Sequence, residues 1–373
     1  MTVDANEQDT VSPAPTGAPG DAGRVLRWFA IPHLLSLDAP VVAVVWARLF
    51  ADSLNLNRLF PGVYLMLFCS VWAIYLGDRL LDTAPWKEKI SGTARHRFFR
   101  ERWWALLLLS LLPGGCVVWL AAGDVLGGAY AVPSGIVVAG VVLSGLVCLY
   151  YLLRLTSSRY VNAIAIACLG GAAGLLVLSL VHLPFAIIVG SVVLLILTSG
   201  RCLFVTSVEA IAFPRELLCG VVFALGTVMP VYSHVSDSFV FGLPAEIFAD
   251  GRTLFNLDTV LLAMLCVLNC VGISIWEKTA DSDGNDPQAL AQYAPGVEQQ
   301  FPIMASLIGL VSVALIWDAS PGLSGTWKIK LAVALSAFSL MGIHAFRGRL
   351  HPLASRILAD VMLLWPLVLL PLP

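Results

Sequence analysis

Two clusters of acidic residues have a spacing that could hold a metal ion. Asp78 and Asp82 are four residues apart at the end of an apolar run. On a helix they would share one face, with their Cβ atoms about 5–6 Å apart. Two carboxylates at that distance repel each other unless a cation lies between them, and Mg²⁺ is a hard cation that takes oxygen ligands. The alternative is a solvated helix end at which both acids pair with Arg79.

The second cluster follows another apolar run much later in the chain. Glu277 and Asp281 repeat the spacing of four residues, and Asp286 follows them. Asn269 lies two helical turns before Glu277, on the same stripe of a helix. If the two clusters face each other, they could hold two Mg²⁺ ions around one diphosphate, because metal ions bridge carboxylates and a polyanion. Taken alone, this segment could also be a polar linker.

A basic segment lies just after the first cluster. Residues 93–100 contain Arg95, Arg97 and Arg100. Arginine binds phosphate oxygens in a bidentate manner, so this segment could contact a diphosphate directly. The alternative is a membrane anchor that touches anionic lipid headgroups.

The composition defines the kind of element that must position these residues. Of the 373 residues, 58% are apolar and 12% are charged, whereas a soluble protein has about 25% charged residues. This excludes an ordinary soluble enzyme, a disordered protein and a nucleic-acid-binding protein. The apolar runs are continuous rather than alternating, which favours transmembrane helices over a β-barrel. We therefore predict an all-α, polytopic transmembrane bundle of about 9–11 spans.

The positions of the spans follow from the apolar runs. They fall near 30–50, 60–78, 103–122, 132–153, 161–181, 184–204, 216–234, 256–276, 302–318, 328–346 and 355–372. With a cytoplasmic N-terminus, 17 of the 22 Lys and Arg residues lie on the inner side and 5 on the outer side. This asymmetry is typical of the positive-inside rule. Both acidic clusters then lie at the cytoplasmic face.

The domain organisation is simple. Residues 1–23 are rich in Asp, Pro, Gly and Thr and have almost nothing to bury, so we predict a disordered cytoplasmic tail. Residues 24–373 form a single transmembrane domain. We expect an integral, multi-pass protein of a bacterial cytoplasmic (inner) membrane.

Four short patches resemble the UbiA superfamily of intramembrane prenyltransferases. They are residues 37–40 (Leu-Asp-Ala-Pro), the pair Asp78 and Asp82, residues 213–220 with 226–230, and residues 277–286. The first acidic motif of that family usually begins with Asn-Asp and has a third acid, and the second usually has Asp where Glu277 stands. The family usually has nine spans, whereas eleven are counted here, so the extra pair would fall between the two motifs.

The resemblance implies a Mg²⁺-dependent transfer of a prenyl group. An isoprenyl diphosphate would be the donor and a lipophilic molecule, aromatic or not, the acceptor. The implied catalytic residues are Asp78, Asp82, Glu277 and Asp281, which would also bind metal together with Asp286. The implied substrate-binding residues are Arg79, Arg95, Arg97, Arg215, Asn269 and Lys278.

Two other classes of function stay open. A transporter or a catalytically silent membrane protein of the same fold could use these acids to bind or relay an ion. Asp38 and Asp360 lie within or beside predicted spans, and a charged residue inside a membrane is costly and is a functional candidate by default. Transporters usually place such residues near the bilayer midplane. The two acidic clusters lie at helix ends, which favours the enzyme.

Overall fold

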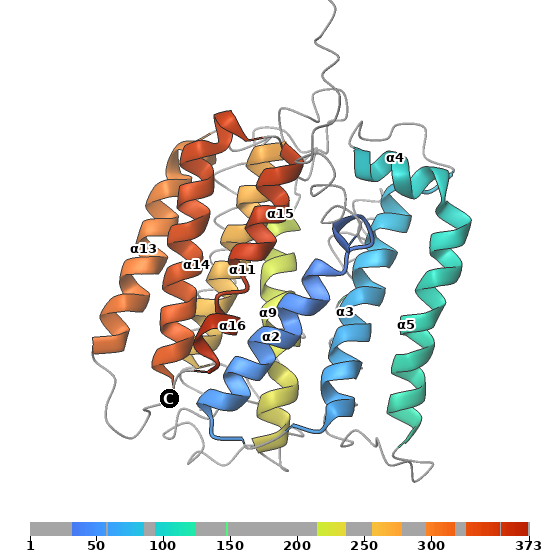
Figure 1. Cartoon of the computed structure of the whole chain (residues 1–373), viewed down its shortest axis with the longest axis horizontal. Helices are drawn as coiled ribbons and strands as arrows, with labels where there is room; N and C mark the ends of the chain where they lie inside the picture. Colours follow the sequence, from blue (N-terminus) through green and yellow to red (C-terminus); the bar gives the residue numbers. More distant parts are fainter. Residues whose placement is uncertain are drawn as a thin grey trace, which may run out of the picture.

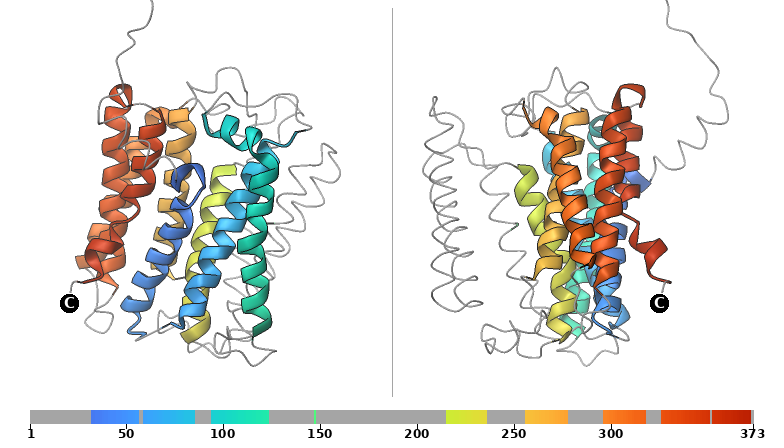
Figure 2. Two further views of the ribbon diagram at one scale, coloured as in Figure 1. Left: turned by 45° about the vertical axis from the view of Figure 1, so that its right-hand side comes forward. Right: turned by 90° about the vertical axis from the view of Figure 1, so that its left-hand side faces the viewer.

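The computed structural model describes residues 32–56, 59–85, 94–123, 147, 215–235, 256–277, 296–317, 326–350 and 352–371. The regular secondary structure of these residues is helical throughout, as the composition predicts. The longer helices run side by side along one direction (Figure 1 and Figure 2).

The helices follow one another in the chain with short irregular connections between some of them. They are α2 (Asp38–Ser53), α3 (Pro61–Asp82), α4 (Ala94–Glu101), α5 (Trp103–Gly123), α9 (Arg215–Val235), α11 (Leu257–Glu277), α13 (Val297–Trp317), α14 (Trp327–Phe346), the 3₁₀ turn Arg347–Arg349, α15 (Pro352–Met362) and α16 (Pro366–Leu369).

Five of these helices are long and apolar enough to cross a membrane. They are Pro61–Asp82, Trp103–Ala122, Leu257–Trp276, Val297–Trp317 and Trp327–Arg349, which correspond to five of the predicted spans. A membrane helix needs about 20 residues, and these have 20 to 23. The chain is therefore a polytopic, helical membrane protein. The predicted spans 132–153, 161–181 and 184–204 lie outside the described residues, apart from residue 147.

The first and the last predicted spans differ most from the structure. The first span was expected from residue 30, but α2 begins at Asp38, after a separate helical turn at residues 32–34. The last span was expected to be continuous over 355–372, but it is divided into α15 and α16. Proline lacks a backbone N–H and fits the first turn of a helix, so Pro366 begins a new helix instead of continuing the old one.

Helices that follow each other closely in the chain, such as α2 and α3 or α13 and α14, run in opposite directions, which places distant parts of the sequence at the same end of the bundle (Figure 1). Trp103 at the start of α5 donates a hydrogen bond of 2.9 Å from Nε1 to the carbonyl oxygen of Leu80 near the end of α3. The Asn256 side chain before α11 hydrogen-bonds the Tyr232 hydroxyl near the end of α9. We call the end at which α3 and α11 finish the upper end, as it is drawn in Figure 1.

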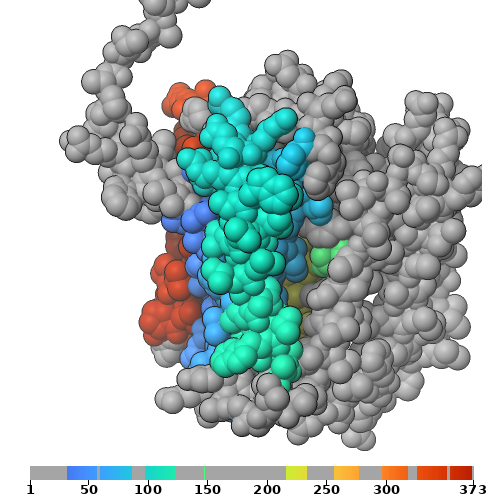
Figure 3. Space-filling view, turned by 90° about the vertical axis from the view of Figure 1, so that its right-hand side faces the viewer, coloured from blue at the N-terminus to red at the C-terminus, as the bar shows by residue number. Residues whose placement is uncertain are grey.

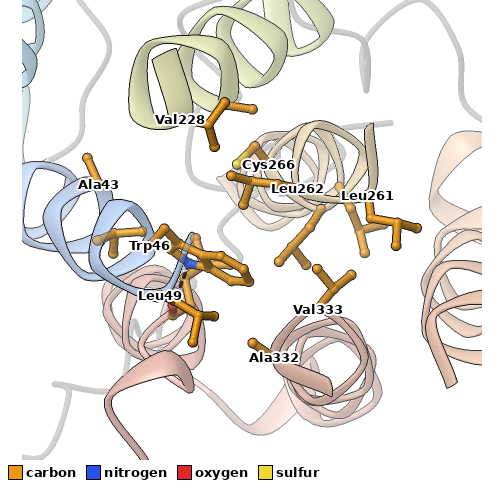
Figure 4. Packing of buried hydrophobic residues seen from close by; sticks show 14 of the residues in the cluster. Ala43, Trp46, Leu49, Val228, Leu261, Leu262, Cys266, Ala332 and Val333 are labelled. Atoms are coloured by element: carbon orange, nitrogen blue, oxygen red, sulfur yellow. Dashed lines mark hydrogen bonds between the residues drawn. The ribbon is translucent and has the colours of Figure 1, made fainter. Parts of the chain in front are cut away.

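The core lies where α2, α9, α11 and α14 meet. Trp46 of α2 is fully buried there and points between α11 and α14, toward Leu262 and Val333 (Figure 4). Its indole Nε1 donates a 2.9 Å hydrogen bond to the carbonyl oxygen of Leu363, which follows α15. This hydrogen bond connects the segment between α15 and α16 to α2.

The outer helices expose large apolar side chains. On α5 the exposed residues include Leu108, Leu112 and Trp119, and this helix forms one face of the described bundle (Figure 3). A row of exposed large apolar side chains marks contact with a membrane or a partner. The helix α5 also has the length and hydropathy of a membrane-spanning helix.

Candidate functional site

The first predicted acidic motif lies at the upper end of α3. Asp78 and Asp82 share one face of the helix, as their spacing predicts, and both contact the same guanidinium nitrogen. Arg79 Nη1 lies 3.8 Å from Asp78 Oδ2 and 3.5 Å from Asp82 Oδ2. The side chains of all three residues are mostly buried. The ion pair with Arg79, the alternative to a metal site, is therefore present.

The second predicted motif begins at the last residue of α11, Glu277, at the same end of the bundle. The side chain of Glu277 and the whole of Lys278, Asp281 and Asp286 lie outside the described residues. The convergence of these carboxylates with Asp78 and Asp82 stays a prediction.

The other predicted substrate-binding residues lie on three helices. Arg95 and Arg97 lie on α4, which follows α3 at the upper end, and Arg97 is exposed. Arg215 is the first residue of α9. Asn269 is buried in the middle of α11, and its Oδ1 has no hydrogen-bond partner among the described residues. The structure thus separates Asn269 from the arginines and places it inside the bundle.

A small cavity lies beside Asn269. Its volume is about 30 Å³, which is room for one or a few water molecules. Its walls come from five parts of the chain and are formed by Ala39, Val42, Tyr75, Gly220, Phe223, Cys266, Asn269, Cys270, Asp360 and Leu363. Most of these side chains are apolar, so the few polar groups among them are the ones that could orient a ligand.

Three titratable side chains meet at one edge of this cavity. His33 Nδ1 lies 2.6 Å from Asp38 Oδ2 and 3.8 Å from Asp360 Oδ2. One ligand atom from each of the three lies within 4.8 Å of the others. Arg356 interacts electrostatically with both carboxylates, and the Asn269 side chain hydrogen-bonds Asp360. We call His33, Asp38 and Asp360 the His–Asp–Asp cluster.

The sequence contained only part of the signal for this cluster. Asp38 and Asp360 could each be singled out as charges beside predicted spans, but nothing in the sequence pairs them. His33 and Tyr75 were missed. The single local clue is that His33 precedes Asp38 by five residues. Pro32 and Ser36 interrupt the apolar run in this segment.

A second polar group lies at the upper ends of α13 and α14. Arg347 Nη2 lies 2.6 Å from Glu298 Oε1, and Arg347 Nη1 lies 2.7 Å from His344 Nε2. The His344 ring stacks on Phe301, with ring centroids 4.8 Å apart. The depression lined by these polar side chains is wide open, so it is a surface feature and not an enclosed site.

The chain matches no protein-family model, no curated protein and no solved structure with which it was compared. An assignment of function therefore depends on the residues described above.

Proposed function

We propose that this protein is an intramembrane prenyltransferase. It would transfer a prenyl group from an isoprenyl diphosphate to a lipophilic acceptor, with Mg²⁺, at the cytoplasmic face of the membrane. The proposal combines the resemblance of the short sequence patches to the UbiA superfamily with the polytopic helical bundle. The upper end of the bundle would face the cytoplasm.

The observation that carries the proposal is the position of the cavity. Tyr75 lines it and lies one helical turn before Asp78 on α3, whereas Asn269 lines it and lies two turns before Glu277 on α11. The two helices that end in acidic motifs therefore border one cavity. A site of this kind needs a polar entrance for the diphosphate and an apolar interior for the reacting carbon, and these helices offer both.

The apolar walls of the cavity suit the chemistry. When the bond from the prenyl carbon to diphosphate breaks, positive charge develops on that carbon, and water would trap it. Val42, Phe223 and Leu363 line the cavity, and apolar walls that exclude water would prevent such side reactions. The cavity of about 30 Å³ is too small for a prenyl chain, so only the reacting carbon would reach it.

The residues at the end of α3 fit a Mg²⁺ site. Two carboxylates contact one guanidinium nitrogen, so their oxygens already converge on a cation. Carboxylates and phosphate oxygens are the ligands that Mg²⁺ usually takes. Asp78 and Asp82 would hold one ion, and Glu277, Asp281 and Asp286 the other. When bound, the metal ions would stabilise the charge of the departing diphosphate.

A titration with geranylgeranyl diphosphate tests the proposal. The purified protein in detergent should bind this ligand with Mg²⁺ and lose the binding when the metal is chelated. Asp78→Asn should weaken the binding by more than about 100-fold, the upper range for losing a group that only supports a metal ligand. Glu101→Gln is the control, because Glu101 is exposed at the same end. A wild-type protein that binds no isoprenyl diphosphate would contradict the proposal.

One observation favours a second candidate, a membrane protein that relays protons or another ion. The His–Asp–Asp cluster lies inside the helical bundle, and chains of Asp, Glu and His inside a membrane often form proton relays. In liposomes loaded with a pH-sensitive dye, such a protein would carry protons, and His33→Gln would stop the flux. A prenyltransferase would show no flux above that of empty liposomes.

A further inference from the structure

A reversal of the chain brings His33 back onto Asp38. The helical turn that begins at Pro32 ends where the amide of Leu37 donates to the Pro32 carbonyl oxygen over 2.9 Å. Ser36, just before Leu37, has a φ of 55°, in the left-handed region, which is a common way to end a helix. The reversal places His33 Nδ1 only 2.6 Å from Oδ2 of Asp38, the first residue of α2.

A neighbouring helix fixes this turn in place. Trp72 Nε1 on α3 donates a 3.0 Å hydrogen bond to the carbonyl oxygen of Leu35. The His33 side chain is only 4% exposed. The fold therefore holds the imidazole ring in one position.

Asp360 approaches the same imidazole from the other end of the chain. It lies on α15, with Oδ2 at 3.8 Å from His33 Nδ1. Among the described residues, the His–Asp–Asp cluster is the one group of three His, Cys, Asp or Glu side chains whose ligand atoms lie within 4.8 Å of one another. The Asp38 and Asp360 side chains are 20% and 18% exposed, so an ion could still reach them.

The separations of these atoms fit a tetrahedral metal ion. Zn²⁺ binds histidine nitrogen at about 2.0–2.1 Å and carboxylate oxygen at about 2.0–2.2 Å, so two of its ligand atoms lie about 3.3 Å apart. The distances from His33 Nδ1 to the two carboxylates, 2.6 and 3.8 Å, lie on either side of this value. Shifts of less than about 1 Å in these two distances would thus complete the geometry.

The ligand types indicate which metal the cluster would take. Mg²⁺ prefers oxygen ligands and keeps several water molecules, whereas an imidazole nitrogen suits Zn²⁺ and its neighbours in the first transition series. One histidine and two carboxylates make three protein ligands. Zinc sites with three protein ligands have a fourth position that is open to water.

Asn269 supplies an independent observation beside the cluster. Its side chain hydrogen-bonds Asp360, whereas its Oδ1 is buried without a hydrogen-bond partner among the described residues. The residue is only 7% exposed and lines the same cavity as Asp360. The cavity has room for water, so a water molecule on the metal could donate to Asn269 Oδ1. Such outer hydrogen bonds orient the groups around a metal.

The charges around the cluster allow a divalent ion to replace a proton. Asp38 and Asp360 hydrogen-bond each other, which requires one proton between the two carboxyl groups. Metal ligands lose such protons when the metal binds. Arg356 interacts with both carboxylates and would leave one positive charge in excess. A hydroxide on the fourth position would balance it, because zinc-bound water ionises near neutral pH.

We infer that His33, Asp38 and Asp360 form a Zn²⁺ site that joins the segment before α2 to α15, with its fourth position at the cavity beside Asn269. The site is separate from the proposed Mg²⁺ ligands of the acidic motifs. The inference does not depend on the proposed function, because it uses none of the residues assigned to diphosphate or Mg²⁺ except Asn269.

A titration with Co²⁺ tests the site directly. Co²⁺ takes the place of Zn²⁺ in tetrahedral sites and absorbs visible light, which Zn²⁺ with its filled d shell does not. The untagged protein is freed of metal with a chelator and titrated in detergent, with excess Mg²⁺ to fill sites made of oxygen ligands alone. One equivalent of Co²⁺ should produce the intense visible bands of a four-coordinate ion, and Zn²⁺ should remove them.

Substitutions assign the signal to the cluster. His33→Gln and Asp360→Asn should each lower the Co²⁺ affinity by more than about 100-fold, the upper range for losing a group that only supports a ligand. His344→Gln is the matched control, because His344 is a buried histidine outside the cluster. Asp78→Asn is the control for the acidic motif. Both controls should bind Co²⁺ as the wild-type protein does.

A further variant gives a signal that a misfolded protein could not. In a background without native cysteines, His33→Cys should retain a Co²⁺ site and add an ultraviolet charge-transfer band from sulfur to cobalt. A thiol is shorter than an imidazole, but its bond to the metal is longer, about 2.3 Å. The band would identify residue 33 as a ligand.

Thermal unfolding provides a readout without a spectroscopic probe. Zn²⁺ that binds only the folded protein raises its midpoint of unfolding, so Zn²⁺ should stabilise the wild-type protein and His344→Gln but not Asp360→Asn. The inference is overturned if the wild-type protein takes up no Co²⁺ in excess Mg²⁺. It is equally overturned if His33→Gln and Asp360→Asn both bind Co²⁺ with the wild-type affinity. Neither result would affect the binding of diphosphate, which tests the proposed function.

Discussion

Gly220 on α9 and Val267 on α11 lie so close together that no side chain fits between them. A Cβ atom at Gly220 would lie 2.5 Å from the backbone nitrogen of Val267 and 2.7 Å from its Cα. Backbone atoms cannot move aside as a flexible side chain can. The same two helices form part of the cavity wall, and Gly220 itself lines the cavity.

Gly220→Ala should therefore destabilise the protein. Adding a methyl group to a packed interface costs about 1–3 kcal/mol, and the two helices would have to separate. Thermal unfolding of the purified protein in detergent measures the change. Gly342→Ala on α14 is the matched control, because a Cβ there meets no atom within 4 Å. Equal stability of the two variants would contradict the close packing of α9 and α11.

The sequence predicts the long helices well because their signal is local. The five helices that can cross a membrane coincide with apolar runs of sufficient length. The break between α15 and α16 was not predicted, although Pro366 is a local signal for it. Contacts that are distant in sequence also stabilise the break. The carbonyl oxygens of Met362, the last residue of α15, and of Leu363, which follows it, accept hydrogen bonds from Ser336 Oγ and Trp46 Nε1, both over 2.9 Å. These donors compensate for the interrupted helix.

The candidate site was predicted only where its signal is local in the sequence. The spacing of Asp78 and Asp82 correctly places both on one helical face, because helical periodicity is local. The meeting of His33, Asp38 and Asp360 depends on how α2 and α15 pack, which no pattern within either helix contains. The proposed substrate contacts of Arg95 and Arg215 stay predictions.

A buried ion pair at the lower end provides a second test of the fold. Lys330 Nζ lies 3.1 Å from Asp258 Oδ1, with side chains 9% and 12% exposed. Lys330→Met should leave the Asp258 charge buried without its partner and lower the stability by about 3–5 kcal/mol. Chemical denaturation in detergent measures this loss.

The double variant Lys330→Met with Asp258→Leu should recover much of that loss, because it removes the uncompensated charge as well. Glu298→Gln is the control, since its ion pair with Arg347 is about 40% exposed and such pairs contribute about 0–1 kcal/mol. A double variant as unstable as Lys330→Met alone would indicate that lost packing, not charge, causes the destabilisation.

The orientation of the bundle can be tested with cysteine labelling. The asymmetry of Lys and Arg predicts a cytoplasmic upper end. Glu101 at that end and Trp317 at the end of α13 are both well exposed. In a background without native cysteines, an impermeant thiol reagent added outside intact cells should label Trp317→Cys and not Glu101→Cys. Labelling of Glu101→Cys alone would reverse the orientation and separate the acidic motifs from a cytoplasmic diphosphate.

Arg79 has two opposing roles in the proposed mechanism, and one substitution separates them. Its guanidinium group lies between Asp78 and Asp82, where it competes with a metal ion for the same carboxylates. It is also a proposed ligand of the diphosphate. Arg79→Gln should therefore strengthen Mg²⁺ binding in the absence of diphosphate, because the competing positive charge is removed. Isothermal titration with Mg²⁺ alone measures this effect.

The same variant should bind geranylgeranyl diphosphate more weakly than the wild-type protein when Mg²⁺ is saturating. The loss of one charged hydrogen bond to phosphate costs about 1.5–3 kcal/mol, or roughly 10- to 150-fold in affinity. Arg102→Gln is the control, because Arg102 lies at the same end but is more than half exposed and pairs with Glu101. If Arg79→Gln leaves both affinities unchanged, Arg79 serves only to neutralise the end of α3. Asp78 and Asp82 would then be structural partners of Arg79 and not metal ligands, and the diphosphate site would have to be sought elsewhere in the bundle.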